Sequence, residues 1–300
     1  MFSLIQQKFR SIVWRVKILI QALALLPCRL IYGNIAGFGN NYWSNRERES
    51  IRKDHINPKK ITEDKSAAIK QLSTLGYFSQ RAKETYTAQL VAERFNILIE
   101  DEKCSIGTAS VTHIINPIQH VPEIKTLLSE PLLETIAGYY ETGVRVETVR
   151  AWRIKHVPNI DANRYDVFSN TFHNDNYPAW GLRVFVVLSE SVRRETGAFR
   201  FLDLPTTQKI ARRLGFLHRY IVSRSVRQEI SDGLRFFEGA RGDILVVNTQ
   251  KCLHGAGVPD RGFYRDVIQF EIYPSKASDF SKLFDSVRDD SKELSVIFEK

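Results

Sequence analysis

Two short stretches of this 300-residue chain contain the side chains best suited to chemistry. The stretch TFHNDNY places His173 two residues before Asp175, and the stretch CLHGAGVPDRGFYRDV contains His254 and, eleven residues later, Arg265. If the fold brings these stretches together, two imidazoles and one carboxylate can hold a non-haem Fe(II) ion and leave further coordination positions open. The guanidinium of Arg265 can then bind a carboxylate beside the metal.

The spacing of the first pair fits a shared metal ion. Alternate residues of a strand point to the same face, so His173 and Asp175 can reach one ion while Asn174 points away. The pair alone is weak evidence, since a chain with seven histidines produces such pairs by chance and a surface turn is the alternative. Its conjunction with a second histidine and an arginine strengthens the prediction.

The second pair lies between two predicted strands. His254 follows the apolar run 243–248, which predicts a buried strand, and the glycines after the histidine allow a tight turn. Arg265 begins the next apolar run, 264–273. Since neighbouring strands lie side by side in a sheet, we expect His254 and Arg265 to face one cavity. A thiol ligand from Cys252 is the less favoured alternative, because a buried thiol usually packs as a small apolar group.

These residues and their order resemble the phytanoyl-CoA dioxygenase family of Fe(II)- and 2-oxoglutarate-dependent oxygenases. The shared pattern is the H-x-D pair, a strand that begins with Gly-Asp and is followed by His-Gly, and the later arginine. Weaker similarity extends to LLSEPLLETIAGYYETGVRVE at 127–147 and ETGAFRFLDLP at 195–205. The resemblance covers roughly residues 72–274 and leaves the first sixty residues unexplained.

The resemblance implies an α+β fold with a mainly β core, a double-stranded β-helix of the jelly-roll or cupin type that helices buttress. It also implies that His173, Asp175 and His254 bind Fe(II), and that Arg265 pairs with the distal carboxylate of 2-oxoglutarate, with O2 as the other co-substrate. Because relatives that halogenate have a small residue where this chain has Asp175, the expected reaction is hydroxylation. The alternative is a non-catalytic membrane-surface or scaffold protein on an oxygenase-like fold.

The sequence departs from the family at one position. Family members commonly have serine two residues after the second histidine, where it helps to hold the co-substrate, and this chain has Ala256. Another side chain must therefore help to hold the co-substrate. The candidates by position are Trp152, Arg153, Thr171 and Asn248. A structural role is the favoured alternative for each of them, because strand ends need polar groups in any fold.

Composition predicts one enzyme domain with an added arm, since 43% hydrophobic residues can bury a substantial core. We expect an arm and linker at 1–45 and a dioxygenase domain at 46–300. Within that domain the expected parts are a helical buttress at about 61–143, a β core at about 144–274 and a helical tail at 275–300. Three cysteines without paired spacing argue against a disulfide framework, so we expect a reducing, cytoplasmic setting.

The N-terminal segment 1–30 is basic and amphipathic. It contains five lysines or arginines and no acid, and its apolar residues recur at helical spacing. Basic side chains interrupt the hydrophobic run before it reaches the roughly 20 apolar residues that a membrane-spanning helix needs. We expect an amphipathic helix that makes peripheral contact with the inner face of a membrane. A helix packed on protein is nearly as well supported, and a signal peptide less so, since no cleavage site follows.

A second basic region, 193–235, lies between the two ligand clusters. It contains ten lysines or arginines and four acids, and its apolar residues from Ile210 to Ile221 have helical spacing. In the family that the chain resembles, residues between the corresponding strands often border the substrate entrance. The resemblance therefore implies that this basic region favours an anionic small-molecule, lipid or lipid-linked substrate. A solvated basic face is the alternative. The chain has no recognised nucleic-acid motif, so we expect no nucleic-acid partner.

Overall fold

The structure is a computed structural model. It describes residues 49–51, 63–82, 85–108, 110–156, 172–175, 181–214, 227–276, 279–289, 291 and 294–295. The arm and linker predicted at 1–45, including the amphipathic helix, lie outside these residues. Among the described helices, none combines the length and the apolar composition needed to cross a bilayer.

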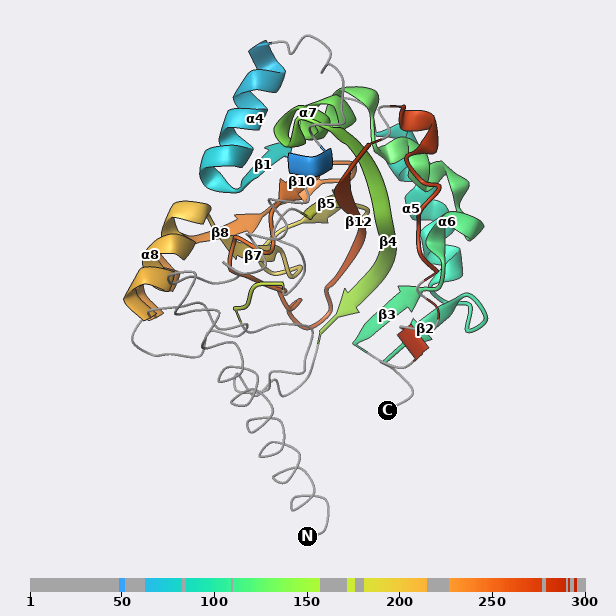
Figure 1. The fold of residues 1–300 in the computed structure, drawn as a ribbon. Coiled ribbons are helices and arrows are strands. Elements are labelled where there is room, and N and C mark those ends of the chain that lie inside the picture. Colours follow the sequence, from blue (N-terminus) through green and yellow to red (C-terminus); the bar gives the residue numbers. More distant parts are fainter. Residues whose placement is uncertain are drawn as a thin grey trace.

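A large antiparallel sheet forms the centre of the fold (Figure 1). Its seven strands have the order β1-β10-β5-β12-β4-β3-β2. Their bounds are Tyr77–Gln80 for β1, Ser105–Gly107 for β2, Val111–Ile114 for β3, Gly143–Lys155 for β4, Leu182–Val187 for β5, Ile244–Val247 for β10 and Tyr264–Ser275 for β12. The two longest strands, β4 and β12, pair with each other along their length, with one register shift.

Two smaller antiparallel sheets complete the β structure. One contains three strands in the order β11-β7-β8, and the other pairs β6 with β9. Their bounds are Phe199–Leu202 for β7, Leu234–Phe237 for β8, His254–Gly255 for β11, Ser191–Val192 for β6 and Gly239–Ala240 for β9. Between β7 and β8 the chain forms helix α8, Leu204–Leu214, and helix α9, Arg227–Gly233.

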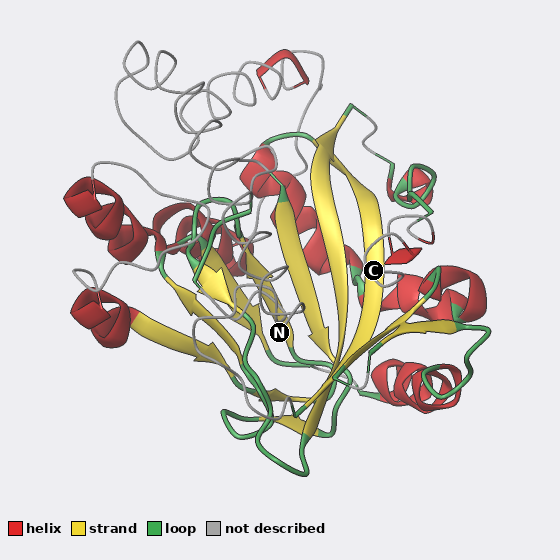
Figure 2. Cartoon of the chain, turned by 90° about the horizontal axis from the view of Figure 1, so that it is seen from below, coloured by secondary structure: helices red, strands yellow, loops and turns green. Residues whose placement is uncertain are grey.

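Helices cover the outer face of the large sheet, and the strands occupy the middle of the molecule (Figure 2). These elements are α4 at Glu63–Leu75, α5 at Tyr86–Leu98, α6 at Pro117–His120, η1 at Pro122–Leu127 and α7 at Glu130–Tyr140. Fully buried Leu72 of α4, Ile136 of α7 and Phe270 of β12 pack in one core. Each such side chain stabilises the fold by about 2 kcal/mol through burial.

Side chains alternate strictly between the two faces of the large sheet along its strands. In β5, Leu182, Val184 and Val186 pack in the core under the helices, whereas Phe185 and Val187 belong to a second apolar cluster on the opposite face. All six residues of this strand are buried. A strand buried on both faces has a continuous apolar sequence, and LRVFVV fits this pattern except for Arg183.

The structure confirms most of the predicted strands. The runs expected at 144–156, 183–188, 198–202, 243–248 and 264–273 form β4, β5, β7, β10 and β12. The strand expected at 167–173 lies largely outside the described residues. Three strands, β1 to β3, occur within 61–143, where we expected helices alone, and each has only three or four residues.

The predicted helices are partly confirmed. The helix expected at 66–75 is α4, but the one expected at 123–140 divides into η1 and α7. Pro131 starts the new helix, since proline fits the first turn of a helix and not its interior. In the described part of 275–300, β12 continues to Ser275, and η3 at Phe280–Lys282 is a single 3-10 turn.

Candidate metal centre and its cavity

His173, Asp175 and His254 come together although 81 positions separate the two histidines. One ligand atom from each lies within 4.8 Å of the others. The Oδ1 atom of Asp175 is 3.7 Å from Nε2 of His254 and 4.0 Å from Nε2 of His173. Ligand atoms that bind one ion at about 2.1 Å are separated by roughly 3 to 4 Å. The three side chains can therefore share a single metal ion.

Backbone pairing places both imidazoles side by side. His173 and His254 form an isolated antiparallel bridge, in which each amide donates to the other's carbonyl at 2.9 Å. The amide of Asp175 donates to the carbonyl of Thr249 at 3.1 Å, so the two ligand segments stay paired beyond the bridge. His254 also pairs with Phe201 of β7, which fixes the position of the second ligand on the small sheet.

The protonation of His254 suits metal binding. Its Nδ1 atom lies 3.1 Å from the carbonyl oxygen of Cys252, so Nδ1–H donates there and the lone pair of Nε2 faces Asp175. Burial lowers the pKa of His254 and favours the neutral ring, although Asp175 opposes this shift. Cys252 thus orients a ligand through its backbone, and its thiol is buried near the carbonyl of Leu75.

The carboxylate of Asp175 is held from the side opposite the imidazoles. The hydroxyl of Thr249 donates to Oδ2 at 2.5 Å, and Nε of Arg183 lies 3.5 Å from the same oxygen. Burial raises the pKa of Asp175, but His254, Arg183 and the Thr249 hydrogen bond together lower it to about 2. The carboxylate is therefore ionised at neutral pH, as a metal ligand must be.

Arg183 joins this carboxylate to a second buried acid. Its Nη1 atom forms an ion pair with Glu271, which also accepts hydrogen bonds from Thr148 at 3.0 Å and from the hydroxyl of Tyr273 at 2.8 Å. Sequence reasoning missed both Arg183 and Thr249. The available signal was an arginine inside the apolar strand LRVFVV, where alternation places it on the same face as Phe185.

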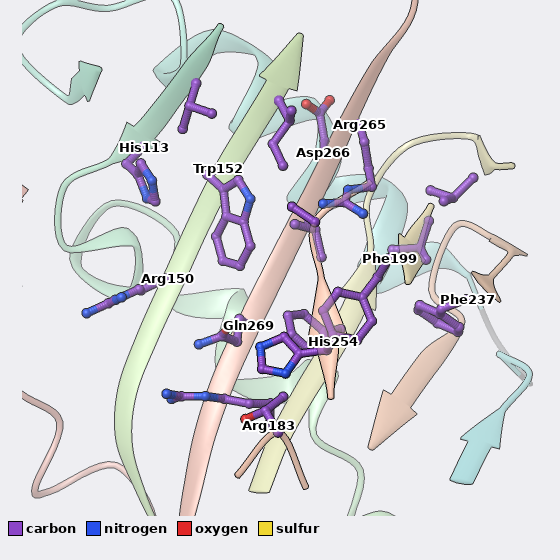
Figure 3. Close-up of a pocket in the computed structure, with 18 of the residues that line it drawn as sticks. His113, Arg150, Trp152, Arg183, Phe199, Phe237, His254, Arg265, Asp266 and Gln269 are labelled. Atoms are coloured by element: carbon purple, nitrogen blue, oxygen red, sulfur yellow. The ribbon is translucent and has the colours of Figure 1, made fainter. Parts of the chain in front are cut away.

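A cavity of about 420 Å³ adjoins the three ligands (Figure 3). The large sheet contributes Phe185 and Val267 to its walls, and the small sheet contributes Phe199 and Phe237. Ala256 also lines it, where the resembling family commonly has serine. The two sheets thus enclose a largely apolar space that has the metal ligands on its wall.

Arg265 lines the same cavity, as its predicted position required. Its side chain is buried, Nη1 donates to the carbonyl of Gly197 at 2.5 Å, and Nε has no hydrogen-bond partner. No described carboxylate forms an ion pair with it, and burial lowers its pKa to about 10. Since a buried cation without a counter-ion is costly, this arrangement suits an anionic ligand.

The structure distinguishes among the other predicted donors. Trp152 lines the cavity, but Arg153 forms two bonds of 2.7 and 2.8 Å to Asp266 and others to residues of α5 and its C-terminal end. Asn248 accepts from the amide of Lys251 and shapes the turn before His254. Arg153 and Asn248 are not among the residues that line the cavity. Thr171 lies outside the described residues.

The basic region 193–235 is partly neutralised where the structure describes it. Arg235 donates to Asp203 at 2.7 Å, and Arg213 forms an ion pair with Glu229 between α8 and α9. Ile210 of the predicted apolar stripe is buried in α8. Residues 215–226 lie outside the described part.

Comparison with known proteins gives a likeness of fold. No protein-family model matches the sequence, and no curated protein matches it. Among solved structures, EctD from S. alaskensis, crystallised with 2-oxoglutarate and 5-hydroxyectoine, is 12% identical with a TM-score of 0.52, and the alignment covers 73% of this chain and 82% of that one. At this identity the likeness establishes the fold alone.

Two further structures have a similar fold. HygX from Streptomyces hygroscopicus, with nickel, 2-oxoglutarate and hygromycin B, is 14% identical over 72% of this chain and 88% of that one, with a TM-score of 0.49. The epimerase SnoN, in complex with Fe³⁺, alpha-ketoglutarate and nogalamycin RO, is 16% identical over 71% and 87%, with a TM-score of 0.48. All three of these structures contain 2-oxoglutarate, and two of them also contain nickel or Fe³⁺.

Proposed function

We propose that this protein is an Fe(II)- and 2-oxoglutarate-dependent dioxygenase that hydroxylates an anionic substrate. The observation that carries the proposal is the convergence of two imidazole Nε2 atoms and one ionised carboxylate oxygen on the wall of an apolar cavity. In this assignment His173, Asp175 and His254 hold the iron, Arg265 holds the distal carboxylate of 2-oxoglutarate, and O2 is the other co-substrate.

The donor set fits this metal. Two neutral imidazoles and one carboxylate on one side of an ion form the facial arrangement typical of non-haem Fe(II) oxygenases. A structural zinc site would need a fourth protein ligand, and no fourth histidine, cysteine or acid joins the described group. Thr249 and Arg183 fix Oδ2 of Asp175, so Oδ1 is the oxygen that faces the ion.

The cavity also fits 2-oxoglutarate. Phe199, Val187 and Val267 are among the apolar side chains that line the cavity together with the candidate ligands and Arg265. Arg265 would hold one carboxylate of 2-oxoglutarate, and these apolar side chains would contact its methylene groups. When bound, iron and 2-oxoglutarate supply the oxidation of a substrate C–H bond by O2, with release of succinate and CO2.

The protein's own residues set the conditions for that chemistry. The phenylalanines of both sheets give the cavity apolar walls, and the Arg183 network keeps Asp175 ionised and oriented. Because the third ligand is a carboxylate rather than a small residue, we assign hydroxylation rather than halogenation. The order of motifs supports a phytanoyl-CoA dioxygenase-like subfamily, and the two facing sheets support a double-stranded β-helix.

The proposal also covers where the protein is located in the cell. We assign the basic segment 1–30 to peripheral contact with the inner face of a membrane and the catalytic domain to the cytoplasm, where 2-oxoglutarate is made. Flotation with anionic liposomes should carry the full chain upward and leave a variant without residues 1–30 behind. Equal flotation of both forms would refute the membrane contact and leave the oxygenase assignment intact.

Succinate formation tests the enzymatic proposal. With Fe(II), ascorbate, 2-oxoglutarate, O2 and a cellular metabolite and lipid extract, the wild-type protein should convert 2-oxoglutarate to succinate, and a chelator or the substitution Asp175→Ala should abolish this. Extract before and after incubation should show a compound with one added oxygen. A wild-type protein that forms no succinate under these conditions would favour the non-catalytic alternative.

A further inference from the structure

One wall of the cavity contains polar and aromatic side chains that neither the metal site nor the Arg265 site uses. These are His113 of β3, Arg150 and Trp152 of β4, and Gln269 of β12. Strand register brings them together, since His113 lies opposite Trp152 and Arg150 lies opposite Gln269. In Figure 3 these four residues lie on one side of the cavity, across from Phe199 and Phe237.

The aromatic part of this wall is flat and uncharged. The rings of His113 and Trp152 are stacked, with centroids 5.6 Å apart and an angle of 29° between the planes. Burial and the nearby charge of Arg150 lower the pKa of His113 to about 3, so the imidazole is neutral at physiological pH. A neutral imidazole stacked on an indole stabilises an apolar or planar group by contact.

The polar part of the wall contains a guanidinium and an amide. Arg150 adds a positive charge on this wall, and Gln269 beside it adds an amide that can donate or accept a hydrogen bond. A guanidinium next to an amide matches the oxygens of a carboxylate or a phosphate.

We propose that this wall is the substrate subsite, and that the substrate is an acid whose carboxylate or phosphate binds Arg150 and Gln269 while its apolar body lies against Trp152. This assignment rests on the proposed oxygenase function and specifies its substrate class. Gln269 lies between Arg150 on β4 and Phe185 on β5 in the sheet. The charged end is thus anchored at β4 and β12, and the apolar body lies along β4 beside Trp152.

Binding of small aromatic acids tests the proposal without knowledge of the natural substrate. The protein is loaded with Fe(II) and 2-oxoglutarate without O2, and the visible band of that complex is recorded. Phenylacetate, phenyl phosphate and the neutral phenylacetamide are then titrated in, and binding is measured by calorimetry. The variants are Arg150→Gln and Gln269→Leu. Arg94→Gln on α5 is the matched control, since it removes the same charge on the covered side of the sheet.

The wild type and the Arg94→Gln control should bind at least one acid, and phenylacetamide at least tenfold more weakly. Arg150→Gln should reduce acid affinity by about tenfold or more, Gln269→Leu by less, and the band should persist in every variant. The acid that binds more tightly decides between a carboxylate and a phosphate substrate.

Three results would overturn the subsite while the oxygenase proposal stands. They are acids that bind no better than the amide, an Arg150→Gln variant that binds them like the wild type, and acids that remove the band by displacing 2-oxoglutarate. Absence of the band in the wild type before any titration would instead contradict the oxygenase function itself.

Discussion

Asp175 presents one carboxylate oxygen to the imidazoles and the other to Arg183, whose Nε lies 3.5 Å from Oδ2. Thr249 donates to this same Oδ2 atom at 2.5 Å, whereas Oδ1 is the atom nearest Nε2 of His254, at 3.7 Å. The division leaves Oδ1 available to a metal as a single, oriented donor. Contacts behind a ligand commonly account for ten- to hundredfold in metal affinity.

Arg183→Met should weaken Fe(II) binding by roughly ten- to hundredfold, because Asp175 loses its cationic partner. It should also destabilise the protein by about 3 to 5 kcal/mol, since Glu271 becomes a buried acid without its ion pair. The double variant Arg183→Met, Glu271→Gln distinguishes the two effects, because it removes the unpaired acid but does not restore the cation beside Asp175. We expect the double variant to be more stable than Arg183→Met in urea unfolding, while anaerobic Fe(II) titration still shows weak binding. Restored metal affinity in the double variant would contradict the role assigned to Arg183.

Arg265→Leu should weaken 2-oxoglutarate binding by tenfold or more and leave Fe(II) binding unchanged, because the guanidinium lies in the cavity without contacting the triad. Without ligands, this variant should melt at the same or a higher temperature than the wild type. The reason is that the substitution removes a buried charge that lacks a described acidic partner. Calorimetry with the metal-loaded protein measures the first effect. Equal 2-oxoglutarate affinity in both proteins would remove Arg265 from the site.

Gly257→Ala should destabilise the protein by about 1 to 3 kcal/mol, because a Cβ atom there would lie 2.0 Å from the carbonyl oxygen of Ala198. The new atom would also lie 2.5 Å from the carbonyl oxygen of Gly197, which accepts from Arg265. We therefore expect weaker 2-oxoglutarate binding as well. The control is Gly262→Ala, where φ is +88° and nothing lies within 4 Å of the new atom. If both variants bind 2-oxoglutarate equally well, close packing at Gly257 has no bearing on the site.

The buried His113 predicts a pH dependence of stability. Its pKa is about 3 in the folded protein and near 6.5 when exposed, so below pH 6.5 the unfolded chain binds a proton that the folded protein excludes. Its contribution therefore lowers stability as pH falls from 6.5 toward 3, by up to about 1.4 kcal/mol per pH unit. Between pH 7 and pH 5, His113→Asn should lose roughly 1 to 2 kcal/mol less stability than the wild type in urea unfolding. If the wild type and His113→Asn lose the same amount of stability between pH 7 and pH 5, His113 is not buried as a neutral ring.

The sequence predicted the three candidate metal ligands because their spacing carries the information. His173 and Asp175 differ by two positions, and strand geometry alone places both on one face. Their pairing with His254 needed the family resemblance, since an isolated bridge between distant segments leaves no local pattern. Arg183 and Thr249 were missed for the same reason, because each acts on Asp175 only once the sheet has formed.

Short elements were the weakest part of the fold prediction. Strands β1 to β3 contain three or four residues each, too few for alternation to be distinguished from helical spacing. Longer strands such as β4 and β12 were predicted correctly because their apolar runs extend over ten or more residues. The substrate subsite depends on β3 and on cross-strand pairs, so it became visible only in the folded arrangement.

Anaerobic titration with Fe(II) and 2-oxoglutarate tests the central claim most directly. The wild-type protein should develop the weak visible charge-transfer band of the iron complex of 2-oxoglutarate, with one iron per chain. Asp175→Ala should lose this band, and His113→Asn, which leaves the three ligands in place, should keep it. A wild-type protein that shows no band at saturating iron and 2-oxoglutarate, or an Asp175→Ala variant with an undiminished band, would contradict the account.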